Sequence, residues 1–251
     1  MNTSQIPRYP VTIDGETTQI GTANELSIAL DVLNGQSDRA ILEQLRPHLA
    51  EIVGGATGFT NAMRSLETEN QLFLIDAIGN QLANVIQQAR YLRDLLAALA
   101  EEQVEQRLIE TLGTDGLRAL IITPTELGEV LEWIYGSSDQ RVIDLLGADY
   151  LRRMIRNGVD LGLVLNGLEE SGQANLVEKI EWARVAQLVS NGRDLAFLMR
   201  ALPASLSASL IDQFTREQLI DLIGNKLDWA YLYERLEPSE VKNLFDKIGA
   251  K

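Results

Sequence analysis

A recurring five-residue pattern constrains the fold of this chain more than any other feature of the sequence. The pattern consists of two apolar residues, an acidic residue, a variable residue and a further apolar residue. It begins at Ile41, Leu74, Leu108, Val142, Leu176, Leu210 and Leu244, so its period is 34 positions after a first step of 33. A fixed period of roughly 20 to 50 residues is typical of repeat proteins, whose single units cannot bury their apolar faces alone.

One copy of the repeat contains several short helical segments. In the copy at 142–175, apolar residues cluster at 142–146, 151–155 and 161–168, and Gly147 and Asn157-Gly158 separate the clusters. Glycine and asparagine suit the left-handed residue that ends a helix, and Asp149 and Asp160 suit the helix starts that follow. Each copy therefore holds two or three short helices, and we prefer three. Helices of about eight to ten residues are unstable alone, so they must stack on the neighbouring copies.

The sequence thus predicts an all-α protein, a right-handed α-solenoid of 34-residue repeats. Residues 21–251 are expected to form a single array because a stack grows by adding units. The predicted units lie near 41–73, 74–107, 108–141, 142–175, 176–209 and 210–243, with a partial unit at 244–251. Whether the last copy is a natural cap or the beginning of further repeats stays open.

Residues 1–20 do not follow the repeat. Apolar and polar residues alternate between Tyr9 and Ile20 around Asp14-Gly15, a dipeptide that suits a tight hairpin turn. This pattern predicts a short N-terminal β-hairpin or extended arm. A two-stranded hairpin is marginal in water, so we expect it to cap the first helices. Asn24 is predicted to cap the first helix.

The period invites comparison with known helical repeats. Tetratricopeptide repeats have this length, but the chain lacks their Trp-Leu-Gly-Tyr and small-residue pattern and has more helix stops. The DNA-reading repeats of plant-pathogen effectors also match in length but need a basic array, and HEAT and armadillo repeats are longer. The chain therefore resembles the α-solenoid class as a whole, and this resemblance implies no particular residue roles.

Charge and composition limit the classes of partner. The chain has 22 Lys and Arg against 36 Asp and Glu, a net charge of −14. Such a surface repels nucleic acid and anionic lipid, whereas it attracts a basic protein. Cysteine is absent, which fits a reducing compartment. No run reaches the roughly 18 apolar residues of a membrane span, and the N-terminus does not read as a secretory signal. We expect a cytoplasmic protein, or a secreted effector acting in a reducing compartment, with no membrane association.

The acidic residue of each copy recurs at the third position of the pattern. We call these residues the acidic ladder: Glu43, Asp76, Glu110, Asp144, Glu178, Asp212 and Asp246. Two interpretations are open. The acids can be structural, accepting amide hydrogen bonds or pairing with an arginine such as Arg118 or Arg152. Alternatively they form a strip that binds a cationic partner. Asp160, Asp194 and Asp228, with Glu126 in the equivalent place, are expected to cap helices.

Other chemistry-bearing residues are few. His48 is the only histidine, so paired-histidine metal sites are impossible, and we expect it to be exposed at a helix start. Trp133 and Tyr135 lie beyond an apolar stripe and are candidate partner-binding residues, although a larger neighbour contact would also explain them. Trp229 and Tyr233 replace core leucines and are expected to be buried. No metal ligands or cofactor-binding residues are predicted.

These observations favour a non-enzymatic protein-binding scaffold or adaptor that uses an extended acidic surface. Two alternatives remain: an inhibitor that mimics the acidic ligand of a basic partner, and an enzyme or small-molecule binder with a carboxylate-lined groove. The candidate partner-binding residues are the acidic ladder, Trp133 and Tyr135. The identity of the partner, the binding face and the oligomeric state cannot be read from the sequence.

Overall fold

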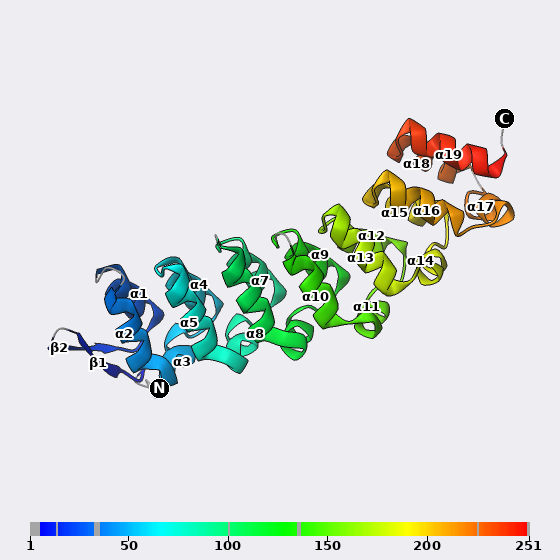
Figure 1. Ribbon diagram of the computed structural model, residues 1–251. Helices are drawn as coiled ribbons and strands as arrows, with labels where there is room; N and C mark the ends of the chain where they lie inside the picture. The colour runs from blue at the N-terminus through cyan, green and yellow to red at the C-terminus, as the bar shows by residue number, and fades with distance from the viewer. Residues whose placement is uncertain are drawn as a thin grey trace. The chain divides into compact units, whose positions relative to one another are not determined.

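The computed structural model describes residues 6–13, 15–32, 36–99, 101–134, 137–224 and 226–249. These residues are mostly helical, with one two-stranded hairpin at the N-terminal end, as the sequence predicts (Figure 1). The chain divides into two compact units. Unit 1 comprises the residues up to Ile121 together with Trp133–Leu145, and unit 2 comprises Ile122–Glu132 and Leu146–Lys251. No helix of the described residues is both long and apolar enough to cross a bilayer.

Unit 1 contains the hairpin and the first helices. Its strands and α-helices are β1 (Tyr9–Ile13), β2 (Glu16–Ile20), α1 (Ala23–Val32), α2 (Gln36–Leu45), α3 (Leu49–Val53), α4 (Ala56–Arg64), α5 (Thr68–Ile78), α6 (Leu82–Ile86), α7 (Ala89–Leu96), α8 (Glu102–Leu120) and α10 (Ser138–Leu146). Two single-turn 3-10 helices lie at Arg46–His48 and Gly79–Gln81. The long helix α8 is kinked at Gly113, whose φ is 58°.

Unit 2 contains the remaining helices. They are α9 (Pro124–Leu131), α11 (Ala148–Met154), α12 (Gly158–Leu165), α13 (Glu170–Ile180), α14 (Trp182–Leu188), α15 (Gly192–Ala201), α16 (Ala204–Asp212), α17 (Arg216–Leu222), α18 (Lys226–Arg235) and α19 (Pro238–Ile248). The starts of α13, α14 and α15 recur 34 positions later as the starts of α16, α17 and α18. Three helices therefore occupy each of these two segments.

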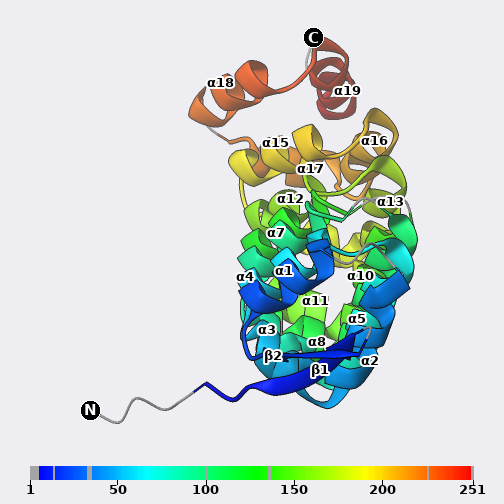
Figure 2. The same cartoon turned by 90° about the vertical axis from the view of Figure 1, so that its left-hand side faces the viewer.

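The hairpin packs on the first helices of unit 1 (Figure 2). Strands β1 and β2 are antiparallel, and Tyr9 pairs with Ile20 in the register. The Gln44 side chain of α2 accepts a hydrogen bond from the amide of Thr12 at 2.9 Å and donates one to its carbonyl at 3.0 Å. Val11 is fully buried. The outer edge of β1 is thus satisfied by a side chain, and the predicted covering of the first helices is confirmed.

The first helix begins differently from the prediction. Helix α1 starts at Ala23, before Asn24. The hydroxyl of Thr22 accepts the amide of Glu25 at 3.3 Å, and the Glu25 carboxylate accepts the amide of Gly21 at 2.9 Å. A threonine followed three residues later by a glutamate satisfies two free amides at the helix start at once. A single asparagine cap would satisfy only one, so the helix begins with the threonine–glutamate pair.

The apolar residues of the repeat pattern form the cores of both units. The first residue of every copy, from Ile41 to Leu244, has no exposed surface. In unit 2, the helices α9, α12, α15 and α18 pack in succession, and we call these four helices the helix row. Their first residues lie at positions 124, 158, 192 and 226, a constant step of 34.

The helix row packs through small residues. A Cβ atom at Gly128 of α9 would collide with the carbonyl oxygen of Leu163 on α12. A Cβ atom at Gly162 of α12 would overlap the ring of Phe197 on α15. Glycine is therefore required at these two positions because the neighbouring helix occupies the space of a side chain.

A partly or fully buried polar position links consecutive helices in both units. The Gln71 side chain donates to the carbonyl of Met63 at 2.8 Å, and the Ser207 hydroxyl donates to that of Met199 at 2.8 Å. Gln173 donates in the same way to Leu165, also eight residues earlier. Each donor satisfies a carbonyl at the end of the preceding helix. Asp38 occupies the equivalent position on α2, where a charged carboxylate cannot donate.

Asp38 is therefore expected to destabilise unit 1 at neutral pH. Its side chain is 3% exposed, and its Oδ1 atom has no hydrogen-bond partner among the described residues. Burial raises the pKa of Asp38, and the nearby carboxylates of Glu67 and Asp31 raise it further. A raised folded-state pKa means that the contribution to stability is present below the ordinary value of 3.8 and is lost as pH rises through the folded-state pKa.

We expect Asp38→Asn to raise the free energy of unfolding at pH 7 by about 1–3 kcal/mol, because an amide is neutral and can donate to the preceding carbonyl. The gain should shrink towards pH 3, where wild-type Asp38 is protonated. Urea unfolding at both values checks this, with the exposed Asp115→Asn as a control that should show no such gain. An Asp38→Asn protein that is no more stable than wild type at pH 7 would contradict the assignment.

Candidate functional site

The acidic ladder lies on the protein surface. All seven residues are exposed, and they belong to α2, α5, α8, α10, α13, α16 and α19. The apolar neighbours in the pattern point into the core, which turns the acidic side chain outward. Each ladder residue is thus available to solvent within its own unit.

Several ladder acids are already paired with cations of the chain. The Asp76 carboxylate accepts a hydrogen bond from the guanidinium of Arg107 at 2.6 Å, and this bond raises the pKa of Arg107. Glu110 lies 3.8 Å from Arg141, which is the residue 34 positions after Arg107. Both cations sit immediately before the next copy of the pattern. In unit 1 these ion pairs therefore connect consecutive copies.

Two further ladder acids pair with cations in different positions. Glu43 pairs with Arg39 one helical turn earlier at 2.8 Å, and Asp212 pairs with Lys247 at 2.8 Å. Of the two arginines expected as partners, Arg152 pairs with Glu181 and Asp149 and not with a ladder acid. The partner is thus a cation just before the next copy for Asp76 and Glu110, a residue of the same helix for Glu43, and a residue within the next copy for Asp212.

Glu181 combines its ion pair with an unusual backbone conformation. Its φ of 75° lies in the left-handed region, which Gly147 occupies 34 positions earlier with the same φ. A non-glycine residue in that region costs of order 1 kcal/mol or more. The Arg152 guanidinium bridges the Glu181 carboxylate and the carbonyl of Lys179. This contact holds the strained turn between α13 and α14.

The second set of recurring acids serves the helix starts. Asn191 caps α15 by accepting the amide of Asp194, whose carboxylate accepts the amide of Ser190 at 3.1 Å. Asp160 and Asn157 make the same pair at α12, and Glu126 pairs with Thr123 at α9. The predicted capping role of Asp160, Asp194 and Glu126 is confirmed. The residue at the cap position itself is the one three places earlier, so the acid completes a reciprocal pair.

The aromatic candidates are spread over different surroundings. Trp133 is 39% exposed, as expected, and Tyr135 lies outside the described residues. The predicted burial of Tyr233 was wrong, because its side chain is 56% exposed. Trp229 is half-buried and stacks on Phe245 of α19 with 5.0 Å between ring centroids. Substitution at a core position therefore does not by itself bury the side chain.

His48 has a structural environment. It ends a 3-10 turn, is half-buried, and stacks on the ring of Tyr9 with the centroids 3.7 Å apart. The Tyr9 hydroxyl donates to the Glu51 carboxylate at 2.6 Å, and this bond raises the pKa of Tyr9. The expectation of an exposed histidine was wrong because the hairpin covers it.

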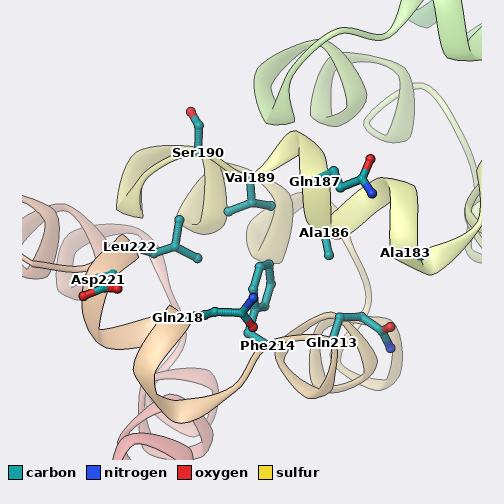
Figure 3. A pocket seen from close by; sticks show the side chains of 10 residues that line it. All are labelled: Ala183, Ala186, Gln187, Val189, Ser190, Gln213, Phe214, Gln218, Asp221 and Leu222. Carbon is teal, nitrogen blue, oxygen red and sulfur yellow. The ribbon is translucent and has the colours of Figure 1, made fainter.

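A groove in unit 2 is the concave feature that sequence reasoning missed. It lies between α14 and α17 and has a volume of about 590 Å³. Val189 and Phe214 are buried and form its floor with Leu222, and these three side chains point toward one another (Figure 3). Ala183 and Ala186 form one wall. Small alanines on α14 leave the space open, and this combination of distant positions has no local sequence signal.

The rim of this groove is polar. Gln187, Gln213 and Gln218 line it together with Ser190, and Asp221 is the one ionisable residue among the lining residues. One of these polar groups is already hydrogen-bonded within the groove wall, because the Gln218 side chain accepts a hydrogen bond from the amide of Thr215 at 2.8 Å. The exposed Asp221 carboxylate carries a negative charge beside the apolar floor. An apolar floor with a few polar edge groups is the usual composition of a binding surface.

The groove lining contains few groups that could transfer a proton. General acid–base catalysis needs at least one positioned proton donor and one acceptor near the reacting atoms. The groove lining supplies one carboxylate, with amide and hydroxyl groups beside it. Among the described residues, no three acidic or histidine side chains are placed to hold a metal ion.

Comparison with known proteins assigns no family. No protein-family model matches the chain, and no curated protein matches it in sequence.

The ion pairs of the acidic ladder should contribute modestly to stability. We expect Asp76→Asn to lower the free energy of unfolding by about 0.2–1 kcal/mol at low salt, because it removes an exposed pair with Arg107. The loss should shrink at high salt as the pair is screened. Glu178→Gln, which alters an exposed ladder acid that forms no ion pair with the described residues, is the matched control and should have no such effect. Urea unfolding at two salt concentrations measures both, and equal effects of the two changes would count against the inter-copy pairing.

Proposed function

We propose that the chain is a right-handed α-solenoid of 34-residue repeats that works as a non-enzymatic scaffold for a protein partner. The constant step of the helix row and the recurrence of α13–α15 as α16–α18 support a repeat stack. Stacks of this kind present extended surfaces made of equivalent positions, which suit recognition of another chain.

The observation that carries this proposal is the groove between α14 and α17. Its apolar floor fits one or two apolar side chains, and the amide groups of Gln187 and Gln213 at the rim can pair with the main chain of an extended segment. Asp221 favours a basic residue beside them. The partner is therefore a protein segment that combines apolar and basic side chains.

Charge supports a cationic partner at longer range. Unit 1 contains 18 Asp and Glu against nine Lys and Arg, so most of the net charge of −14 belongs to it. The exposed acidic ladder contributes to this field, although Asp76 and Glu110 are partly neutralised by their arginines. Long-range attraction raises the rate of encounter more than the final affinity. The ladder, Trp133 and Tyr135 thus remain proposed contributors to binding, and the groove is the proposed anchor.

The proposal is tested with an array of synthetic extended peptides that vary in apolar and basic content. Ala186→Arg should abolish binding because it fills the groove and brings a positive charge. Asp221→Asn should weaken basic peptides about two- to fivefold, as expected for one exposed charge pair. Ala204→Arg, on the exposed face of α16 outside the groove, is the matched control and should bind like wild type.

Other results would redirect the assignment. If no peptide binds, or if Ala186→Arg binds every peptide as wild type does, the groove is not the anchor. Loss of binding in the triple variant Glu110→Gln, Asp144→Asn, Glu178→Gln, with Ala186→Arg unaffected, would move the anchor to the acidic ladder. Binding of small metabolites in place of peptides would favour the small-molecule alternative.

A further inference from the structure

Helices α11, α14 and α17 of unit 2 change in charge at equivalent surface positions. They begin at residues 148, 182 and 216, a constant step of 34, and Figure 1 shows them one after another within unit 2. The equivalent residues Arg153, Gln187 and Asp221, again 34 positions apart, are all exposed. The surface at this position therefore changes from positive on α11 through neutral on α14 to negative on α17.

A second arginine strengthens the positive end. Arg156 lies just after α11, and its equivalents are the uncharged Ser190 and Gly224. Both Arg153 and Arg156 are exposed, and neither forms an ion pair with another described residue. Residues 148–156 contain three arginines and one acid, so this segment is positive within a chain of net charge −14.

The third arginine of this segment is engaged within the protein. Arg152 pairs with Asp149 of α11 and with Glu181 at the start of α14, and it donates to the carbonyl of Lys179 at 3.5 Å. These contacts place the end of α11 beside the beginning of α14. They also take up the acid of α11, so the charges of Arg153 and Arg156 are left for a partner.

Arg184 connects the positive surface to the groove between α14 and α17. It lies on α14, is half-buried, and donates a hydrogen bond to Oε1 of Gln187 at 3.3 Å. Gln187 lines the groove from α14, and Asp221 lines it from α17 (Figure 3). A segment that leaves the groove over Gln187 therefore passes Arg184 on its way to α11.

We propose that the protein segment bound in this groove crosses α14 and carries an acidic residue that binds Arg153 and Arg156, at the end opposite to its basic residue. This inference rests on the proposed function, because it takes the groove as the anchor. Guanidinium groups bind carboxylates through paired N–H donors, so two neighbouring arginines fit an Asp or Glu side chain. We call this partner the bipolar segment: basic beside Asp221, apolar over the groove floor and acidic over α11.

Helix spacing sets the distance between the two charges of the bipolar segment. Packed helices lie about 10 Å apart, and an extended chain rises about 3.3 Å per residue. Two helix steps separate α11 from α17, so the basic and acidic residues lie about six positions apart in the segment. A uniformly basic segment would instead place a like charge against Arg153.

The contact is tested with two synthetic peptides and the full chain, by fluorescence anisotropy. One peptide has the bipolar order with the charges about six positions apart, and the other has glutamine in place of its acid. Wild type should bind the bipolar peptide about two- to fivefold more tightly at low salt, as expected for an exposed charge pair. The net charge of −14 by itself predicts the opposite order, because it repels the added acid.

The variant Arg153→Gln, Arg156→Gln should lose this preference and bind the two peptides alike. The matched control is Arg193→Gln, Arg200→Gln, which removes two exposed arginines of α15 and should keep the preference. Both variants alter exposed side chains, so their helical circular dichroism should match that of wild type.

The outcomes separate this inference from the proposed function. If wild type binds both peptides equally and Ala186→Arg abolishes that binding, the groove remains the anchor and the acidic contact on α11 is disproved. A preference that survives in Arg153→Gln, Arg156→Gln would also overturn the inference, because the acid would then bind elsewhere. If neither peptide binds, and a single-stranded oligonucleotide binds through the two arginines instead, both proposals are wrong.

Discussion

The close approach of neighbouring helices in the helix row is the contact on which the rest of unit 2 depends. At Gly128 and Gly162 the next helix occupies the position of the missing side chain, so backbone packs directly against backbone or ring. Short helices such as α12 cannot hold their shape alone, because one or two turns do not recover the cost of nucleation. Burial against the next helix supplies that stability, and a small residue at one position decides how near the helix can come.

Electrostatic interactions in this protein mostly serve the turns and helix ends. Asp160 and Asp194 complete reciprocal caps, Arg107 and Arg141 join consecutive copies in unit 1, and Arg152 holds the turn at Glu181. A chain with a large negative charge thus places many of its cations on specific acids. The proposed partner would therefore meet the exposed carboxylates that are not engaged in these contacts, and a groove with one acid at its rim.

The sequence alone predicted the features that repeat and missed those that depend on distant contacts. The 34-residue period located the buried first residue of each copy and the exposed acid beside it, because burial alternates within one short helix. The sequence also located the hairpin, through Asp14-Gly15 and the alternation of apolar and polar residues around it. Other features depend on contacts between segments that are distant in the sequence, and no local pattern encodes these contacts. They are the arginine partners of the acids, the stacking of His48 on Tyr9 and the exposure of Tyr233. The α14–α17 groove is set by Ala183 and Ala186 facing α17, two alanines that look ordinary in the sequence.

One periodic polar position also shows what the sequence alone predicts and what only the structure reveals. Gln71, Gln173 and Ser207 recur with the period, yet their shared task, donation to a carbonyl eight residues earlier, becomes visible only with the helices in place. Asp38, Glu105 and Asp139 are the buried copies of this position that carry a carboxylate, which cannot donate when charged. The repeat therefore serves as an internal comparison, in which each departure from the common residue identifies a position with altered chemistry.

Hydrogen exchange of wild type and Gly162→Val tests the central claim, that the helix row is stabilised by contact between neighbouring helices. A valine at this position would overlap the ring of Phe197 and separate α12 from α15. The account predicts faster amide exchange in both of these helices and in α9 and α18 beyond them, with α4 of unit 1 unchanged. Faster exchange confined to α12 would contradict it, because the helices would then be stable without their neighbours.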